Sequence, residues 1–194
     1  MVFIGVFSHP LGVKFGSGKS VFCIKQLIKI YGSWDIAKQY IVYSPNELLA
    51  LINKHVKATL WDDAGVWAHR RGSRKIIDSI FEIKEKISRL YITASRPSIL
   101  PRKLLNALDY FIYIYRPLPL TWGFELKDKD PWRARAILFK GEDGLRAYRA
   151  LSSGREAASI ASIEFDLYFE HYKEYEEHRG KYVRLAFEEV GKEI

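Results

Sequence analysis

Gly16-Ser17-Gly18-Lys19-Ser20 is the stretch that decides the fold. It follows Val2–Ser8, a continuous apolar run of the kind that forms a strand buried on both faces. It leads into a segment from about Lys19 to Tyr31 that predicts a helix ending at Gly32. Glycines in this position let backbone N–H groups turn toward one anion, beside the positive end of the helix. The stretch therefore predicts a loop that binds phosphate groups.

The polar side chains of this loop predict binding of a nucleoside triphosphate together with Mg²⁺. Lys19 is expected to reach the β- and γ-phosphates, and the hydroxyl of Ser20 to ligate Mg²⁺. The glycine that usually stands five residues before Gly18 is replaced by Val13, and Gly12 lies one residue earlier. The loop is thus one residue longer than usual, or it lacks its first glycine. The expected phosphate cradle consists of Gly16, Ser17, Gly18, Lys19, Ser20 and Val21.

Two carboxylates follow the third predicted strand, Lys57–Trp61. In a parallel sheet the end of this strand lies near the phosphate loop, so Asp62 is expected to hold Mg²⁺ through a water molecule. Asp63 is expected to polarise the water that attacks the γ-phosphate. The alternative is that Asp63 only caps the loop after the strand.

The fourth predicted strand, Leu90–Ala94, also ends in polar residues. Because this strand is expected between the first and the third, Thr93 or Ser95 would reach the γ-phosphate or the attacking water. Arg96 would sense the state of the phosphate. The alternative is that Ser95 and Arg96 only open a turn before Pro97.

Strands and helices alternate as far as Tyr115, which indicates an α/β fold with helices on both faces of a mostly parallel sheet. Five strands are expected, in the order 5-1-4-3-2. Residues 1–116 would form this core, and residues 117–194 an extension packed on it. The extension is expected to contain a β-hairpin of Leu118–Leu126 with Trp132–Lys140, and helices at Gly141–Ser152, at Glu156–His178 and after Gly180. Aromatic side chains at helical spacing predict a packing face, with a base-stacking platform as the alternative: Phe165, Tyr168, Phe169, Tyr172 and Tyr175.

The charge of the chain is unevenly distributed. The 194 residues carry a net charge of +8, and residues 164–194 carry nine acidic and five basic side chains, a net of −4. Residues 1–163 therefore carry 26 basic and 14 acidic side chains, a net of +12. Such a basic body suggests nucleic acid, most readily DNA, as a partner, although a solubilising surface charge is the alternative. The candidate contact residues follow the acidic strand: Arg70, Arg71, Arg74 and Lys75.

The composition excludes several classes of protein. Hydrophobic residues make up 48% and charged residues 28%, which is ordinary for a folded globular chain. Cys23 is the only cysteine, so the chain can form no internal disulfide, and a reducing, cytoplasmic compartment is expected. No apolar stretch approaches the length of a membrane span, so no membrane partner is expected. Few Asn, Gln, Cys and Met residues suggest a thermophilic source.

These blocks together resemble the ASCE division of P-loop ATPases. Leu60–Asp63 and Ile92–Pro97 are similar to the acidic strand and the sensor segment of AAA+ replication initiators and helicase loaders of the DnaA and DnaC type. Asp62–Gly65 also resembles compact ATPases of archaeal viruses and plasmids. The resemblance implies the three-layer P-loop NTPase fold, ATP and Mg²⁺ as cofactors, and a role in DNA replication or mobile-element maintenance.

The sequence departs from this family in three ways. Asp63 stands where most ATPases of the division have Glu. No arginine finger precedes the fifth strand. No helical lid with a sensor arginine is recognisable either, and Arg146, Arg149 and Arg155 are weak candidates. Assembly with further copies of the chain is therefore left open.

Three other functions remain open. The first is a DNA-translocating or genome-packaging motor resembling the FtsK–HerA group. The second is a GTPase-like switch, because Trp61–Gly65 resembles the switch segment of small GTPases, although their guanine-reading Asn-Lys-x-Asp motif is missing. The third is an adaptor that binds nucleotide without hydrolysing it, which would follow if Asp63 is a poor base.

Overall fold

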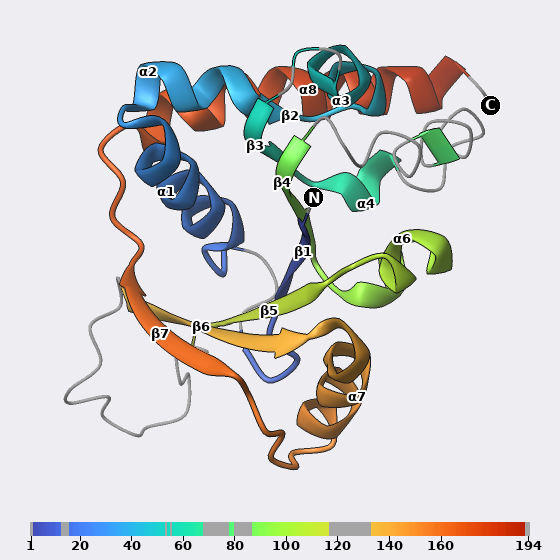
Figure 1. Cartoon of the computed structure of the whole chain (residues 1–194). Helices are drawn as coiled ribbons and strands as arrows, with labels where there is room; N and C mark the ends of the chain where they lie inside the picture. The colour runs from blue at the N-terminus through green and yellow to red at the C-terminus, as the bar shows by residue number, and fades with distance from the viewer. Residues whose placement is uncertain are drawn as a thin grey trace, which may run out of the picture.

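The computed structural model describes residues 2–12, 16–52, 54, 56–67, 78–79, 87–116 and 133–192. These residues form one twisted sheet with helices packed on both of its faces (Figure 1). The prediction of an α/β fold is confirmed. None of the helices in these residues combines the length and the apolar composition that crossing a bilayer requires.

Within the described residues the sheet has seven strands, in the order β2-β3-β4-β1-β5-β6-β7. The strands are β1 Val2–Ser8, β2 Ile41–Val42, β3 Val56–Trp61, β4 Ile87–Ala94, β5 Tyr110–Tyr115, β6 Arg133–Lys140 and β7 Ala161–Asp166. The first five pair in parallel, and β6 and β7 continue the sheet in antiparallel pairing. The central strand β1 lies between β4 and β5.

The prediction of a five-stranded sheet is wrong in strand number and in the complete order, because β6 and β7 extend the sheet beyond β5. β6 corresponds to the second strand of the predicted hairpin, but its two edges pair with β5 and β7. The other half of that hairpin, Leu118–Leu126, lies outside the described residues.

The helices of the described residues are α1 Lys19–Tyr31, α2 Trp34–Ala37, α3 Pro45–Ile52, α4 Ala64–Trp67, α6 Arg102–Asn106, α7 Gly141–Ser152 and α8 Tyr172–Lys192, with 3₁₀ turns η1 Lys38–Tyr40 and η2 Pro97–Ile99. The predicted helices at Lys19–Tyr31 and Gly141–Ser152 are confirmed as α1 and α7. α1 ends at Gly32, whose φ of 86° lets its N–H bond the Ile28 carbonyl at 2.7 Å. Ser44-Pro45-Asn46-Glu47 has the sequence pattern of a capping box, and α3 shows it: the Glu47 carboxylate accepts the Ser44 N–H while the Ser44 hydroxyl accepts the Glu47 N–H.

Two apolar cores cover the two faces of the sheet. On one face, Ile24 of α1 packs with Val6 of β1. On the other face, Leu104 of α6 and Ala147 of α7 pack with Phe7 of β1. The side chains of Val6 and Phe7 thus point into opposite cores, as the two-residue period of a strand requires. The strand is buried on both sides, which explains why its sequence is a continuous apolar run.

The predicted helix at Glu156–His178 is wrong. Residues 161–166 form β7, and α8 begins at Tyr172 and continues through Gly180. The aromatic residues therefore do not share one helical face: Phe169 and Tyr175 are buried, whereas Tyr168 is 65% exposed. The sequence also predicts a helix from about Ser73 to Ser88, most of which falls outside the described residues; the prediction is wrong at its last two residues, which belong to β4.

Candidate functional site

The polar residues of interest meet at the carboxyl ends of three parallel strands. Ser8 ends β1, Thr93 lies near the end of β4, and Asp62 and Asp63 directly follow β3. The register pairs Val6 with Thr93 and Trp61 with Ile92, so these ends lie side by side. In open parallel sheets this edge is where ligands bind.

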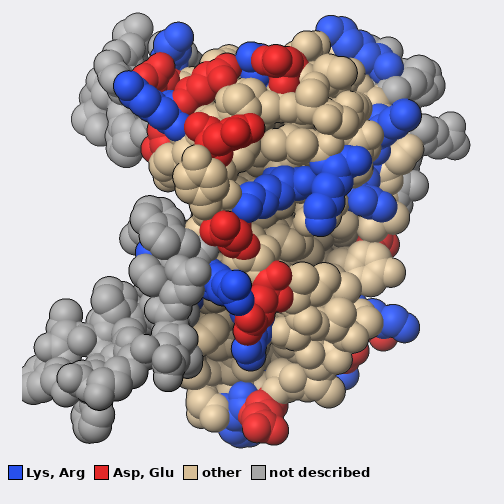
Figure 2. Space-filling view, turned by 90° about the vertical axis from the view of Figure 1, so that its left-hand side faces the viewer, with Lys and Arg blue, Asp and Glu red and all other residues tan. Residues whose placement is uncertain are grey.

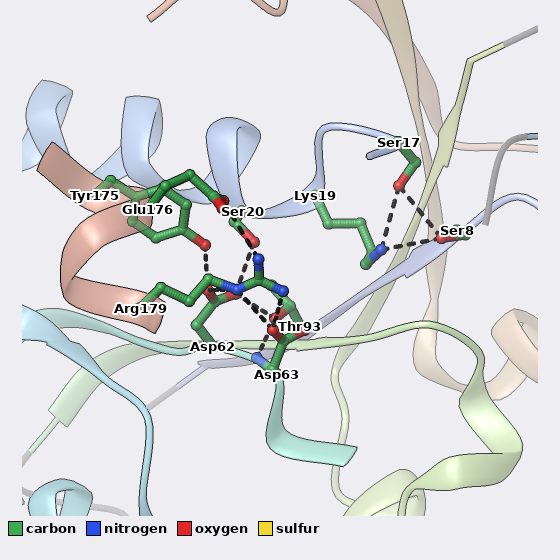
Figure 3. Close-up of polar contacts among 10 residues, drawn as sticks. All are labelled: Ser8, Ser17, Lys19, Ser20, Asp62, Asp63, Thr93, Tyr175, Glu176 and Arg179. Atoms are coloured by element: carbon green, nitrogen blue, oxygen red, sulfur yellow. Dashed lines mark hydrogen bonds and ion pairs between the residues drawn. The ribbon is translucent and has the colours of Figure 1, made fainter. Parts of the chain in front are cut away.

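The glycine-rich loop enters α1 through two residues in the left-handed region, Gly16 at φ 67° and Gly18 at φ 95°. Glycine adopts such angles at little cost, whereas a side chain strains them. The Lys19 ammonium then turns back over the loop and donates to the hydroxyls of Ser8 at 3.1 Å and Ser17 at 3.3 Å (Figure 3). Burial lowers the pKa of Lys19, while the carboxylates of Asp63 and Asp62 raise it in part. Because burial removes water from the Lys19 ammonium, an anion that bound beside it would compensate the lost hydration.

Asp62 is fully buried and accepts three hydroxyl hydrogen bonds. Ser20 and Thr93 donate to Oδ1 at 2.8 and 2.6 Å, and Tyr175 of α8 donates to Oδ2 at 2.5 Å. Burial first, and then the charge of Asp63, raise the pKa of the Asp62 carboxyl. A buried carboxylate loses its hydration, and here hydrogen bonds from three hydroxyls on separate elements compensate that loss.

Asp63 lies at the turn into α4 with φ 49°, a conformation that Asp tolerates better than most residues. Its N–H donates to Thr93 Oγ1 at 2.8 Å, so Thr93 bonds both members of the acid pair. Its carboxylate accepts from Arg179 of α8, with Nε 2.8 Å from Oδ2 (Figure 3). The same Nε lies 3.9 Å from Oδ2 of Asp62.

The structure brings together most of the predicted site residues. Lys19, Ser20, Asp62, Asp63 and Thr93 belong to the contacts described above. Three other predicted residues make none of these side-chain contacts. The Ser95 carbonyl accepts the N–H of Ser8, and Arg96 is exposed just before η2. Val21 is buried in α1. The four predicted DNA-contact residues lie outside the described residues: Arg70, Arg71, Arg74 and Lys75.

Sequence reasoning missed the part of the site that α8 supplies. Tyr175 and Arg179 stand one helical turn apart, and both point toward the end of β3 (Figure 3). Nothing in the sequence connects them with residues more than a hundred positions earlier. Arg116, after β5, was also missed; its guanidinium donates to the Gly16 carbonyl at 2.9 Å.

The segment between β7 and α8 passes over the glycine-rich loop. A Cβ built on Gly18 would lie 2.2 Å from the Leu167 side chain, so this residue is in close contact with the loop. Phe165 stacks edge-on against Phe22 of α1. Farther along, Glu174 of α8 accepts from Trp34 of α2 at 2.7 Å. Residues 165–174 thus pack against the glycine-rich loop, α1 and α2, which border the site.

A groove of about 370 Å³ adjoins the acid pair on the side of β2. Its aromatic lining comes from both sides, with Trp34 and Tyr43 from the body and Tyr175 and His178 from α8. Tyr175 also reaches Asp62, so the groove and the acid pair share a wall.

The oxygen donors of the site suit Mg²⁺. Ser20 Oγ donates to Asp62 Oδ1 at 2.8 Å, so a hydroxyl and a carboxylate, both oxygen donors that Mg²⁺ accepts, stand side by side. In the described residues no group of three or more His, Cys, Asp or Glu side chains could hold a metal. Mg²⁺ differs from Zn²⁺ in this respect, because it commonly keeps several waters and binds one or two carboxylates together with substrate phosphates.

Comparisons with known proteins give a distant likeness. The crystal structure of the N-terminal domain of zonular occludens toxin from Neisseria meningitidis is similar to this chain with a TM-score of 0.49 and 14% sequence identity. The alignment covers 89% of this chain and 98% of that domain. A likeness at this level establishes neither a family nor an activity. No family model and no curated protein matches the chain.

Proposed function

We propose that this chain is a Mg²⁺-dependent P-loop ATPase. One observation carries the proposal: Ser20, next to Lys19 in the glycine-rich loop, donates to Asp62 at the end of β3 across 42 residues of sequence. A glycine-rich turn without a ligand does not need a buried carboxylate beside it. A Mg²⁺·triphosphate site needs both parts, since the loop hydroxyl and the acid would together hold the ion that neutralises phosphate charge.

Each residue has a defined task in this proposal. The backbone N–H groups of the loop and the Lys19 ammonium bind the β- and γ-phosphates, and the hydroxyls of Ser8 and Ser17 orient the ammonium. Ser20 and Asp62 hold Mg²⁺, which when bound neutralises charge on the β- and γ-phosphates.

The base that activates water is assigned to Asp63. Its backbone is fixed through the N–H bond to Thr93, so its carboxylate stands at a defined place beside Asp62. Water attack on the γ-phosphate leaves ADP and inorganic phosphate, and the proton of the water passes to the Asp63 carboxylate. Thr93 positions both acids through one hydroxyl.

The test of this proposal is nucleotide binding by a Lys19→Ala variant. Removing the ammonium takes away the charge on the β- and γ-phosphates, so binding of Mg²⁺·ATP and its turnover should both be lost. Lys29→Ala, at an exposed position of the same helix, is the matched control and should bind as the native protein does. Unchanged ATP binding in Lys19→Ala refutes the proposal. Equal or tighter binding of GTP would support the switch function instead.

Nucleic acid is the proposed partner, and the support is electrostatic. The first 163 residues carry a net charge of +12. Figure 2 shows Lys and Arg side chains gathered near the middle of one face, with Asp and Glu side chains grouped above them. Lys and Arg on one face would contact phosphates of any base sequence. DNA bound near the acid pair would change the rate of ATP hydrolysis.

The DNA proposal is tested with a salt series. The dissociation constant of a random oligonucleotide is measured for the native protein and for a variant in which Arg70, Arg71, Arg74 and Lys75 are replaced by Gln. The slope of log K against log salt should flatten by about 0.9 for each double-stranded phosphate contact that is lost. An unchanged slope removes these four residues from the DNA site. ATPase turnover with and without DNA, alongside light scattering, then separates a monomeric regulator from a ring-forming motor.

A further inference from the structure

The C-terminal segment contacts the candidate site at three successive points. Leu167 lies against Gly18 of the phosphate loop, Tyr175 bonds Asp62, and Arg179 bonds Asp63. These contacts follow the direction in which a bound triphosphate and its metal would lie, from the loop to the acid pair. The segment 167–179 is therefore a strap across the site.

The contact of Arg179 with Asp63 places a positive charge beside the acid pair, where the proposed Mg²⁺ would bind. The Arg179 guanidinium bonds Asp63 through Nε and Nη2, and its Nε is 3.9 Å from Asp62. Its side chain is 32% exposed, so the surrounding solvent screens the pair only in part. Charge-assisted bonds of this kind are roughly twice as strong as neutral ones. Arg179 thus offsets part of the negative charge of the acid pair.

This arrangement is incompatible with the proposed reaction. Two guanidinium N–H groups occupy the Asp63 Oδ2 atom, so this oxygen cannot take the proton of an attacking water while the contact lasts. A divalent ion beside Asp62 also repels a guanidinium less than a side-chain length away. Mg²⁺·nucleotide and the Arg179–Asp63 contact therefore compete.

We propose that Arg179 is a built-in competitor of Mg²⁺·nucleotide, which holds α8 against the acid pair until the nucleotide expels it. The inference rests on the proposed ATPase function and adds a regulatory role to α8. Of the other polar contacts of this part of α8, the ion pair of Lys38 with Glu174 is exposed and weak, whereas the Trp34 indole donates to Glu174 at 2.7 Å and would hold the start of the helix in place. Loss of the Arg179 contact, together with rotation of Tyr175, frees the part of α8 that follows Glu174. The position of the helix then reports whether nucleotide is bound.

The experiment compares Arg179→Gln with Lys173→Gln, a control that removes the same charge from an exposed position on α8. The dissociation constant of ATPγS is measured with Mg²⁺ and with EDTA. If the strap is closed about 90% of the time, removing the competitor should tighten Mg²⁺·ATPγS binding by about tenfold. The control should not change it, and neither variant should bind more tightly in EDTA.

The second measurement is hydrogen exchange over residues 172–182 of the native protein. Mg²⁺·ATPγS should speed the exchange of these amides, while ATPγS with EDTA should not. Arg179→Gln should exchange rapidly without any ligand. Should this variant fold poorly by circular dichroism, Tyr175→Phe, which removes only the hydroxyl bond to Asp62, replaces it with the same expected directions.

Two outcomes overturn the inference while the proposed function stands. Weaker binding of Mg²⁺·ATPγS by Arg179→Gln would mean that the guanidinium contacts the nucleotide. Unchanged affinity together with unchanged exchange would mean that α8 is a fixed wall. If the native protein does not bind Mg²⁺·ATPγS at all, the proposed function itself fails, and the competitor role fails with it.

Discussion

Asp62→Asn is expected to stabilise the nucleotide-free protein while weakening its Mg²⁺-dependent nucleotide binding. The amide has nearly the shape of the carboxylate. Its Oδ1 can still accept from Ser20 and Thr93, whose hydroxyls lie 2.8 and 2.6 Å from that atom in the native protein. Its Nδ2 can donate to the Tyr175 hydroxyl, which lies 2.5 Å from the oxygen that it replaces. Both polar atoms of the new side chain keep a partner, so only the charge is lost.

The magnitude follows from this charge. Burial, and then Asp63, raise the pKa of Asp62 above the ordinary 3.8, which means that folding disfavours the ionised side chain relative to the unfolded chain. A permanently neutral amide should therefore add about 1–2 kcal/mol to the free energy of unfolding at pH 7, the scale for relieving a buried charge. For a domain of this size, that corresponds to a rise in Tm of roughly 2–8 °C.

The sign of the pH dependence follows as well. Between the unfolded pKa of Asp62 and its higher folded pKa, the folded state binds more protons than the unfolded state. The stability of the native protein therefore falls as the pH rises through this window. The advantage of Asp62→Asn should be full above the folded pKa and should shrink as the pH approaches 3.8.

The assay is thermal unfolding followed by circular dichroism, with and without Mg²⁺·ATPγS. The native protein should gain about 2.7 kcal/mol at a ligand concentration of about 100 Kd, and the variant should lose most of this gain. Asp143→Asn, which removes a charge from an exposed position on α7, is the control and should change Tm far less. A lower Tm for ligand-free Asp62→Asn, or an undiminished Mg²⁺-dependent gain, would refute the reasoning.

Three further substitutions test single contacts. Gly18→Ala places a Cβ at φ 95° and 2.2 Å from the Leu167 side chain, so the urea midpoint should report a loss of about 1–2 kcal/mol, whereas Gly180→Ala has open space and should not destabilise. Thr93→Val keeps the shape of the side chain but takes the acceptor from the part-buried Asp63 N–H and a donor from the buried Asp62 carboxylate, so unfolding should become easier by about 1–3 kcal/mol; native stability would exclude this hydroxyl as an anchor. Asp63→Asn should retain ATP but slow its turnover by roughly two orders of magnitude in a phosphate-release assay, and a native rate would move the base elsewhere.

The phosphate loop and the acid pair could be predicted from the sequence because their signals are local. A buried strand, two glycines and a helix start lie within the first 20 residues, and Asp62 directly follows an apolar strand. The capping box of Ser44 and Glu47 is equally local, since it joins residues three positions apart. Such patterns fix the backbone over one or two turns, whatever the rest of the chain does.

The prediction of a helix at Glu156–His178 was wrong because a helical and a strand period of apolar residues overlap in this segment. Aromatic residues between positions 165 and 175 fit a helical period, and this pattern hid the strict alternation in Ala161–Asp166. There Ala161, Ile163 and Phe165 alternate with polar residues, which is the signature of a strand at the edge of a sheet. Reading this alternation first would have predicted β7. The contacts of Arg179 have no such signal, because they depend on where α8 lies in the folded sheet.

The hydrogen bond between Tyr175 and Asp62 spans 113 residues, and this separation has a consequence during synthesis. A ribosome that has made the first 62 residues must add most of the remaining chain before Tyr175 and Arg179 exist. During that time the sheet can assemble around an acid pair that lacks its two α8 partners. If the site binds Mg²⁺·ATP as proposed, the nucleotide can therefore reach the nascent site before residues 167–179 do. The first molecule to occupy this site in the life of each chain is expected to be the nucleotide, with α8 docking only after its release.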